Sequence, residues 1–157
     1  MALQGAPLKV EGITPHGIID IELAGTVPRA IEIYNNWKPD LIPIAIRHIF
    51  IDFLFLISYG TFLFAACLSL SKRFGKMARK VGVWMSILMI LTSVFDALEN
   101  ILMLSTLSAH FKKEIVASTF IFASTKFILA GLGILYIIFS LTAHLLFTKK
   151  KIIRLQE

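Results

Sequence analysis

The stretch PIAIRHIFIDFLFLISYGTFLFAACLSL, residues 43–70, decides the fold class. It is long and apolar enough to cross a bilayer, which takes about 20 residues of helix. Two more stretches share this character, at about 81–107 and 115–147. Of the 157 residues, 57% are hydrophobic and only 17% are charged, whereas soluble domains are about 45–50% apolar. The sequence therefore predicts an all-α membrane protein with a three-helix transmembrane bundle.

Basic residues are concentrated at two places along the chain. The loop 71–80 and the basic tail 148–157 together hold nine of the sixteen Lys and Arg residues, with one acid, Glu157. By the positive-inside rule both segments are cytoplasmic, so three spans place the N-terminus outside, in what we expect to be a bacterial inner membrane. The basic excess is explained by orientation, with weak attraction to anionic membrane lipid. Nucleic acid is therefore not expected as a partner.

Residues 1–42 form an N-terminal segment with too many charged residues for a membrane span. We expect it to be extracytoplasmic, with a short amphipathic helix at about 27–37 on the outer surface. Thr26 is the expected N-cap, Pro28 suits the first turn, and Trp37 is typical of the membrane boundary. The expected apolar face consists of Val27, Ala30, Ile31 and Tyr34.

Three alternative structures remain open for parts of this segment: a short strand, a disordered tail and a fourth span. Residues 19–23, IDIEL, alternate apolar and acidic side chains, which is typical of a short strand. The alternative to a surface helix is that the whole N-terminal segment is a disordered tail. A fourth span at residues 13–34 would have to insert four charged side chains, including Asp20 and Arg29, into the bilayer.

Each predicted span carries an ionisable residue at a similar depth. At 1.5 Å per residue, Asp52, Asp96 and Lys126 lie about 15–16 Å from the outer edge, near the middle of a roughly 30 Å core. Polar and small residues also line one face of each helix, which favours close helix packing. The three faces are His48, Asp52, Phe55 and Tyr59; Ser86, Met89, Ser93, Asp96, Asn100 and Met103; and Thr119, Lys126, Ala130, Gly133 and Ser140.

Charge within this predicted cluster does not balance. Lys126 is one cation facing Asp52, Asp96 and Glu99, so at least one carboxyl group needs a proton or a second cation. We predict a structural ion pair between Lys126 and Asp96, with Asp52 as the alternative partner. The predicted ligand- or proton-binding residues are Asp52, Glu99, Asn100, His48 and Tyr59. The hypothesis is a site for a proton or a small polar or cationic ligand that enters from the outer face.

Other functions remain open at this stage. The polar cluster would serve only helix packing if the protein is a structural or accessory subunit of a membrane complex. Catalysis is a third alternative, but the chain has no HExxH, GxSxG, phosphate-loop or Cys/His metal motif, so no catalytic residue, cofactor or metal is predicted. Three helices make a thin bundle, so a homo-oligomer or another membrane subunit is expected.

Four stretches carry a resemblance to a known group of proteins. They are IIDIELAGT at 18–26, the amphipathic segment that ends at Trp37, IDFLFLISYG at 51–60 and FDALENI at 95–101. With these motifs the chain resembles small, uncharacterised bacterial integral membrane proteins that have an acidic, amphipathic N-terminal segment before three transmembrane helices. The resemblance covers about residues 18–140 and implies no activity. It does imply that Asp20 and Glu22 belong in one unit with the transmembrane acids.

Overall fold

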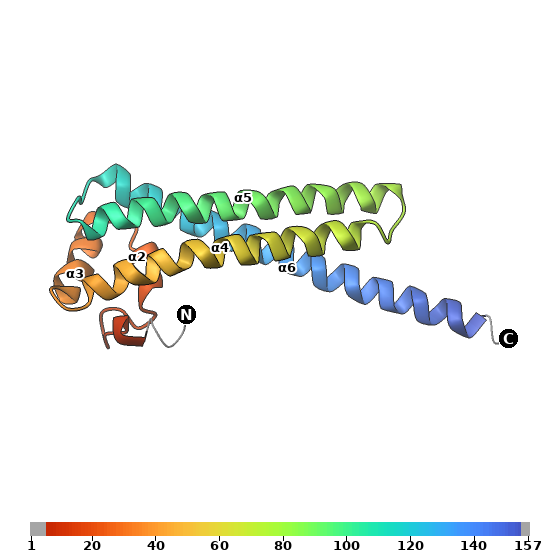
Figure 1. Cartoon of the computed structure of the whole chain (residues 1–157), viewed down its shortest axis with the longest axis horizontal. Helices are drawn as coiled ribbons and strands as arrows, with labels where there is room; N and C mark the ends of the chain where they lie inside the picture. Colours follow the sequence, from red (N-terminus) through yellow and green to blue (C-terminus); the bar gives the residue numbers. More distant parts are fainter. Residues whose placement is uncertain (1–5, 155–157) are drawn as a thin grey trace. The chain divides into compact units, whose positions relative to one another are not determined.

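The computed structural model describes the backbone of residues 6–154 and the side chains of residues 6–147. All of its regular elements are helices within this described part (Figure 1). An isolated β-bridge joins Val10 and Thr14. The elements are η1 (Ala6–Leu8), α2 (Ile18–Glu22), α3 (Val27–Trp37), α4 (Ile42–Ser71), α5 (Lys76–Leu107) and α6 (Lys113–Arg154).

The three long helices correspond to the three predicted spans. Their apolar parts, Ile42–Ser71, Lys76–Leu107 and Lys113–Phe147, are long and apolar enough to cross a membrane. The chain is therefore an all-α integral membrane protein. Helix α6 continues to Arg154, so the backbone of the predicted tail is helical where it is described, and residues 155–157 lie outside the described residues.

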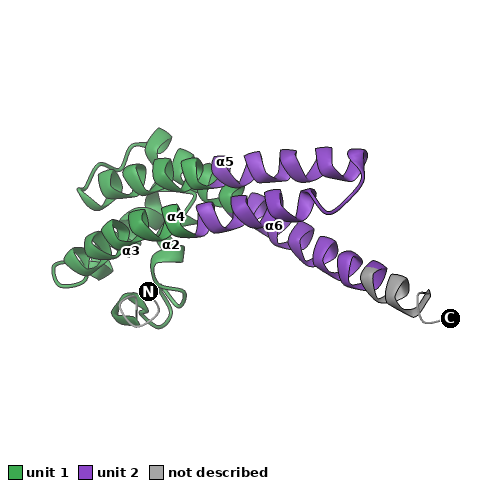
Figure 2. Ribbon diagram, turned by 45° about the vertical axis from the view of Figure 1, so that its right-hand side comes forward, with its two compact units in different colours: residues 1–58, 93–126 green, residues 59–92, 127–157 purple. Residues whose placement is uncertain are grey.

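The chain divides into two compact units, coloured in Figure 2. Unit 1 holds residues 1–58 and 93–126, and unit 2 holds residues 59–92 and 127–157. Each long helix therefore contributes one part to each unit. The apolar core of unit 1 combines the N-terminal segment with the two neighbouring spans, and it consists of Leu8, Ile21, Ile33, Trp37, Ala45, Ile49, Met103 and Leu107.

The segment 19–23, where the sequence pattern indicates a strand, is helical instead. Ile21 and Glu22 are both buried, at 3% and 7% exposure, whereas Ile19 and Leu23 are about 40% exposed. Such neighbouring burial fits one face of a helix and not the alternating faces of a strand. Gly17 precedes α2 at a φ of 70°, and the Asp20 carboxylate accepts a hydrogen bond from the His16 backbone N–H. These local contacts favour the helical turn.

Helix α3 has the predicted bounds, but it buries a different face. Ala30, Ile33 and Trp37 are fully buried. Of the predicted face only Ala30 is among them, and Val27, Ile31 and Tyr34 are half-buried. Trp37 lies in the apolar core of unit 1, and its Nε1 donates a hydrogen bond of 3.2 Å to Thr14 Oγ1. Thr26 occupies the N-cap position without a side-chain cap hydrogen bond. The N-terminal segment therefore contributes side chains to the apolar core of unit 1.

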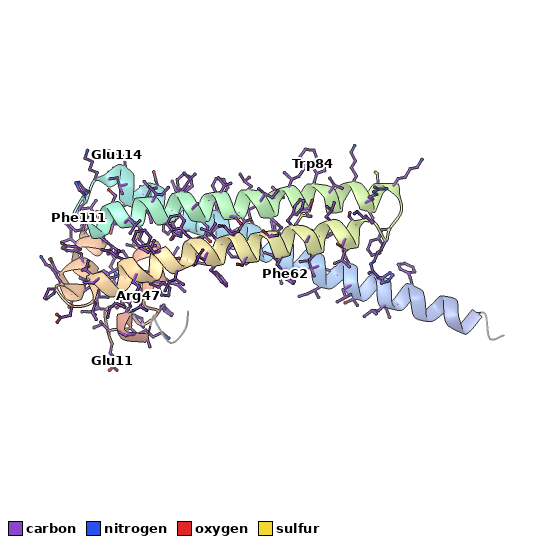
Figure 3. The ribbon with its side chains drawn as sticks, viewed as in Figure 1. Glu11, Arg47, Phe62, Trp84, Phe111 and Glu114 are labelled. Carbon is purple, nitrogen blue, oxygen red and sulfur yellow. The ribbon has the colours of Figure 1, made fainter. Side chains whose placement is uncertain are left out.

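Unit 2 has a second apolar core built on Leu63, Cys67 and Met89. Two glycines permit close contacts here. A Cβ atom at Gly82 would clash with the Tyr136 hydroxyl and the Ser71 side chain, and one at Gly133 would clash with Met89. Large apolar side chains such as Phe62 and Trp84, 68% and 61% exposed, lie on the outside of this unit (Figure 3). Such a surface suits a lipid environment.

Candidate functional site

The side chain of Lys126 is the centre of a buried charge cluster in unit 1. Its ammonium Nζ lies 2.7 Å from Asp96 Oδ1, 2.5 Å from Glu99 Oε2 and 3.5 Å from Glu22 Oε2. The four side chains come from α2, α5 and α6, and each is at most 9% exposed. One cation therefore faces three carboxyl groups in a site that is shielded from water. We call these four residues the Lys126 cluster.

Glu99 is the most deeply enclosed member of the Lys126 cluster, with no exposed surface. Asp96 and Glu99 are three residues apart on α5, so one helix face presents both acids to Lys126. Lys126 donates a hydrogen bond to Asp96, but Glu99 Oε1 finds no hydrogen-bond partner among the described residues. A buried polar atom without a partner costs about 1–3 kcal/mol, and more if it is charged. A proton or a bound ligand at Glu99 would lower that cost.

A fourth carboxyl group lies beside the Lys126 cluster. Asn100 Nδ2 donates a hydrogen bond of 2.8 Å to Asp52 Oδ2, which joins α4 to α5. Asn100 is 1% exposed, and Asp52 is partly buried. His48 lies one turn before Asp52 on α4, and its Nδ1 is buried without a hydrogen-bond partner among the described residues.

Glu22 is the member of the Lys126 cluster that lies outside the candidate membrane spans. Gly17 and Gly25, at φ values of 70° and 67°, flank the short helix that carries it, and both conformations favour glycine. Burial raises the pKa of Glu22 above its ordinary value of 4.5, and the attraction to Lys126 opposes this increase. Burial is the larger effect, and the negative charges of Asp52 and Asp96 raise the pKa of Glu22 further.

The structure brings together most of the residues that the sequence singled out. Asp96, Lys126 and Glu99 are in contact, and Asp52 and Asn100 are hydrogen-bonded. The predicted faces of α5 and α6 are largely buried. On the predicted face of α4, His48, Asp52 and Tyr59 are half-buried and Phe55 is 50% exposed.

Tyr59 packs against the Leu63, Cys67 and Met89 core of unit 2, and its binding role stays a prediction. It follows Asp52 by seven residues, which separates the two residues by about 10 Å along the helix.

The resemblance drawn from the sequence implied that Asp20 and Glu22 share the site with the transmembrane acids. Glu22 contacts Lys126, whereas Asp20 lies 3.3 Å from the ring of His16. A helical reading of residues 18–22 would have separated the two acids, because residues two apart face different directions. Reasoning from the residues alone missed Glu22.

Within the described residues, no group of three His, Cys, Asp or Glu side chains is arranged to hold a metal ion. Comparisons of this chain with protein-family models, with curated proteins and with solved structures gave no match. The functional argument therefore depends on the geometry and charge of the Lys126 cluster.

Proposed function

We propose that this membrane protein binds protons, or a small cation in their place, at the Lys126 cluster and the adjoining Asp52. The observation that carries the proposal is the surplus of carboxyl groups: Glu22, Asp96 and Glu99 surround one ammonium within 3.5 Å. With every group ionised, the Lys126 cluster would have a net charge of −2, and Asp52 would add a further negative charge. A buried surplus of this kind is costly and is normally neutralised by protonation or by a cation.

Access to the site is from the outer face in this proposal. The basic loop 71–80 and the basic tail point to a cytoplasmic side opposite the N-terminus, in an inner membrane of bacterial type. Glu22 then belongs to the outer segment and connects the buried acids with the outside. A proton or a small cation reaches Glu22 first and is shared with Glu99, while Asp96 and Lys126 hold α5 and α6 in register. Asp52, positioned by Asn100, and His48 form the second branch of the site.

An infrared spectrum of the purified protein tests this proposal directly. At neutral pH the wild type should show the C=O stretch of a buried, protonated carboxylic acid, because one or more of the surplus groups holds a proton. Glu99→Gln and Glu22→Gln should each alter or remove this band. Glu114→Gln is the matched control, because Glu114 is exposed at the start of α6. Addition of methylammonium should reduce the band if a small organic cation displaces the proton.

A structural or accessory subunit is the second candidate function. The near-complete burial of Lys126, Asp96 and Glu99 favours it, because buried ion pairs can specify which helices meet. In that case the surplus proton would be a fixed part of the fold, so the protonated-acid band would be present but would not respond to added cations. The functional consequence of the Gln variants would then be a change in stability or in co-purification with a partner subunit.

A further inference from the structure

Unit 2 contains an apolar groove of about 290 Å³, distinct from the Lys126 cluster. This volume is at the lower end of ligand cavities, which span roughly 300–1,000 Å³. The groove lies between the start of α5 and the second half of α6. Its lining residues are Phe74, Ala78, Val81, Tyr136, Phe139, Ser140 and Ala143. Its aromatic and aliphatic walls suit part of a hydrocarbon chain.

Polar groups lie directly beside these apolar walls. Arg73 precedes the lining residue Phe74, and His144 follows the lining residue Ala143. Arg73 Nη1 donates a hydrogen bond of 2.8 Å to His144 Nε2, which ties the α4–α5 loop to α6. The guanidinium has five N–H donors, and the bond to His144 uses one of them, so with respect to the described side chains the others can donate to an acceptor such as a phosphate. The Arg73–His144 pair therefore places a phosphate-binding group next to the groove.

The charge of unit 2 is strongly one-sided. The ten-residue stretch 71–80 contains the lining residues Phe74 and Ala78. It also carries five exposed cations: Lys72, Arg73, Lys76, Arg79 and Lys80. Residues 59–92 and 127–156 contain no Asp or Glu. These segments of unit 2 therefore have no side-chain carboxylate that could pair with the five cations. In a membrane, a ligand that combines a hydrocarbon chain with an anionic group is an anionic lipid.

We infer that this groove is a binding site for an anionic phospholipid, with an acyl chain along Val81 and Phe139 and the phosphate at Arg73. Basic pockets between transmembrane helices are known to hold anionic headgroups. The apolar walls and the cations are both required, since cations alone give only loose attraction to a charged surface. This site is independent of the proton site proposed above.

Native mass spectrometry of the whole chain, released from a neutral detergent, tests the inference. Dioleoyl phosphatidylglycerol and dioleoyl phosphatidylcholine have the same acyl chains, and only the first is anionic. We expect the wild type to retain phosphatidylglycerol preferentially. Arg73→Gln should lower that retention about fivefold, the effect of one cation near an anionic headgroup. Lys113→Gln, the same loss of charge at an exposed residue of unit 1, should leave it unchanged.

Two further arms separate the lipid from its parts. Ala78→Trp should fill the groove and reduce retention of the intact lipid, whereas Ala65→Trp on an exposed face of α4 should not. Glycerol 3-phosphate, which has the phosphate without acyl chains, should compete poorly. Equal retention of the two lipids would overturn the inference, as would equal losses in Arg73→Gln and Lys113→Gln. Full competition by glycerol 3-phosphate would show a phosphate site and not a lipid site.

Discussion

Lys126 Nζ on α6 lies 2.5 Å from Glu99 Oε2 on α5, a contact closer than that with the hydrogen-bonded Asp96. The contact joins a fully buried acid to a cation that also lies within 3.5 Å of Asp96 and Glu22. Removing the Lys126 charge and removing the Glu99 charge have opposite effects on the net charge of the Lys126 cluster. Loss of Lys126 leaves three acids together, whereas loss of the Glu99 charge reduces the surplus.

The first prediction concerns this asymmetry. Lys126→Met should lower the free energy of unfolding by about 3–5 kcal/mol, because it leaves buried carboxyl groups without their cation. Glu99→Gln in the same chain should restore part of the loss, with a coupling energy of roughly 1–3 kcal/mol. Denaturant unfolding of the single and double variants in detergent measures the cycle.

An exposed ion pair of unit 1 provides the control for this cycle. Arg29 and Glu32 lie 2.7 Å apart with side chains 33% and 52% exposed, and exposed pairs contribute only about 0.2–1 kcal/mol. The Arg29→Met and Glu32→Gln cycle should therefore give a coupling below about 1 kcal/mol. Equal couplings for the two pairs would contradict a special role of the Lys126 cluster.

The second prediction concerns the close contact at Gly82 in unit 2. Gly82→Ala should destabilise the protein by about 1–3 kcal/mol, since the new Cβ would clash with the Tyr136 hydroxyl and with Ser71. Tyr136→Phe removes the clashing oxygen and should relieve part of this cost. Gly131→Ala is the control, because a Cβ there meets nothing within 4 Å. Thermal unfolding should separate the two alanine variants, and similar melting temperatures would argue against the contact.

Sequence reasoning located the spans because an apolar run of about 20 residues admits few other structures in a membrane protein. It also selected Asp96 and Lys126, because the rise of a helix is fixed and depth follows from counting residues. It failed at residues 19–23, where five residues alternate too briefly to separate a strand from one helical turn. Glu22 contacts Lys126 although the two residues are far apart in the sequence. A local pattern of polar and apolar residues does not predict such a contact.

The third prediction concerns the turn between α5 and α6. Ala109 has a φ of 65°, and the N–H of His110 donates to Ser105 O, as in a helix end that usually has glycine in this position. Ala109→Gly should therefore stabilise the protein by about 0.5–1 kcal/mol. Ala117→Gly, within α6, should destabilise it by a similar amount. Denaturant midpoints of the two variants should move in opposite directions, and a shared direction would contradict the strain at Ala109.

The fourth prediction uses the raised pKa of Glu22. Its ordinary value is 4.5, and burial raises the value in the folded protein. Between these two values the folded state binds more protons than the unfolded state, so stability falls as the pH rises. Below about pH 4.5 Glu22 is protonated in both states, and its contribution is then fully present. Glu22→Gln keeps a neutral side chain at every pH and should flatten this part of the stability profile.

Unfolding at a series of pH values from about 4.5 upward measures the effect, with Glu11→Gln as the control at an exposed residue of the same segment. The control should follow the wild type, because an exposed carboxyl group is solvated in both states. A wild-type slope that persists in Glu22→Gln would assign the linked proton to another acid of unit 1. A stability that instead rises with pH only when Glu22 is present would mean that Glu22 folds in its ionised form, since the unfolded state would then bind more protons.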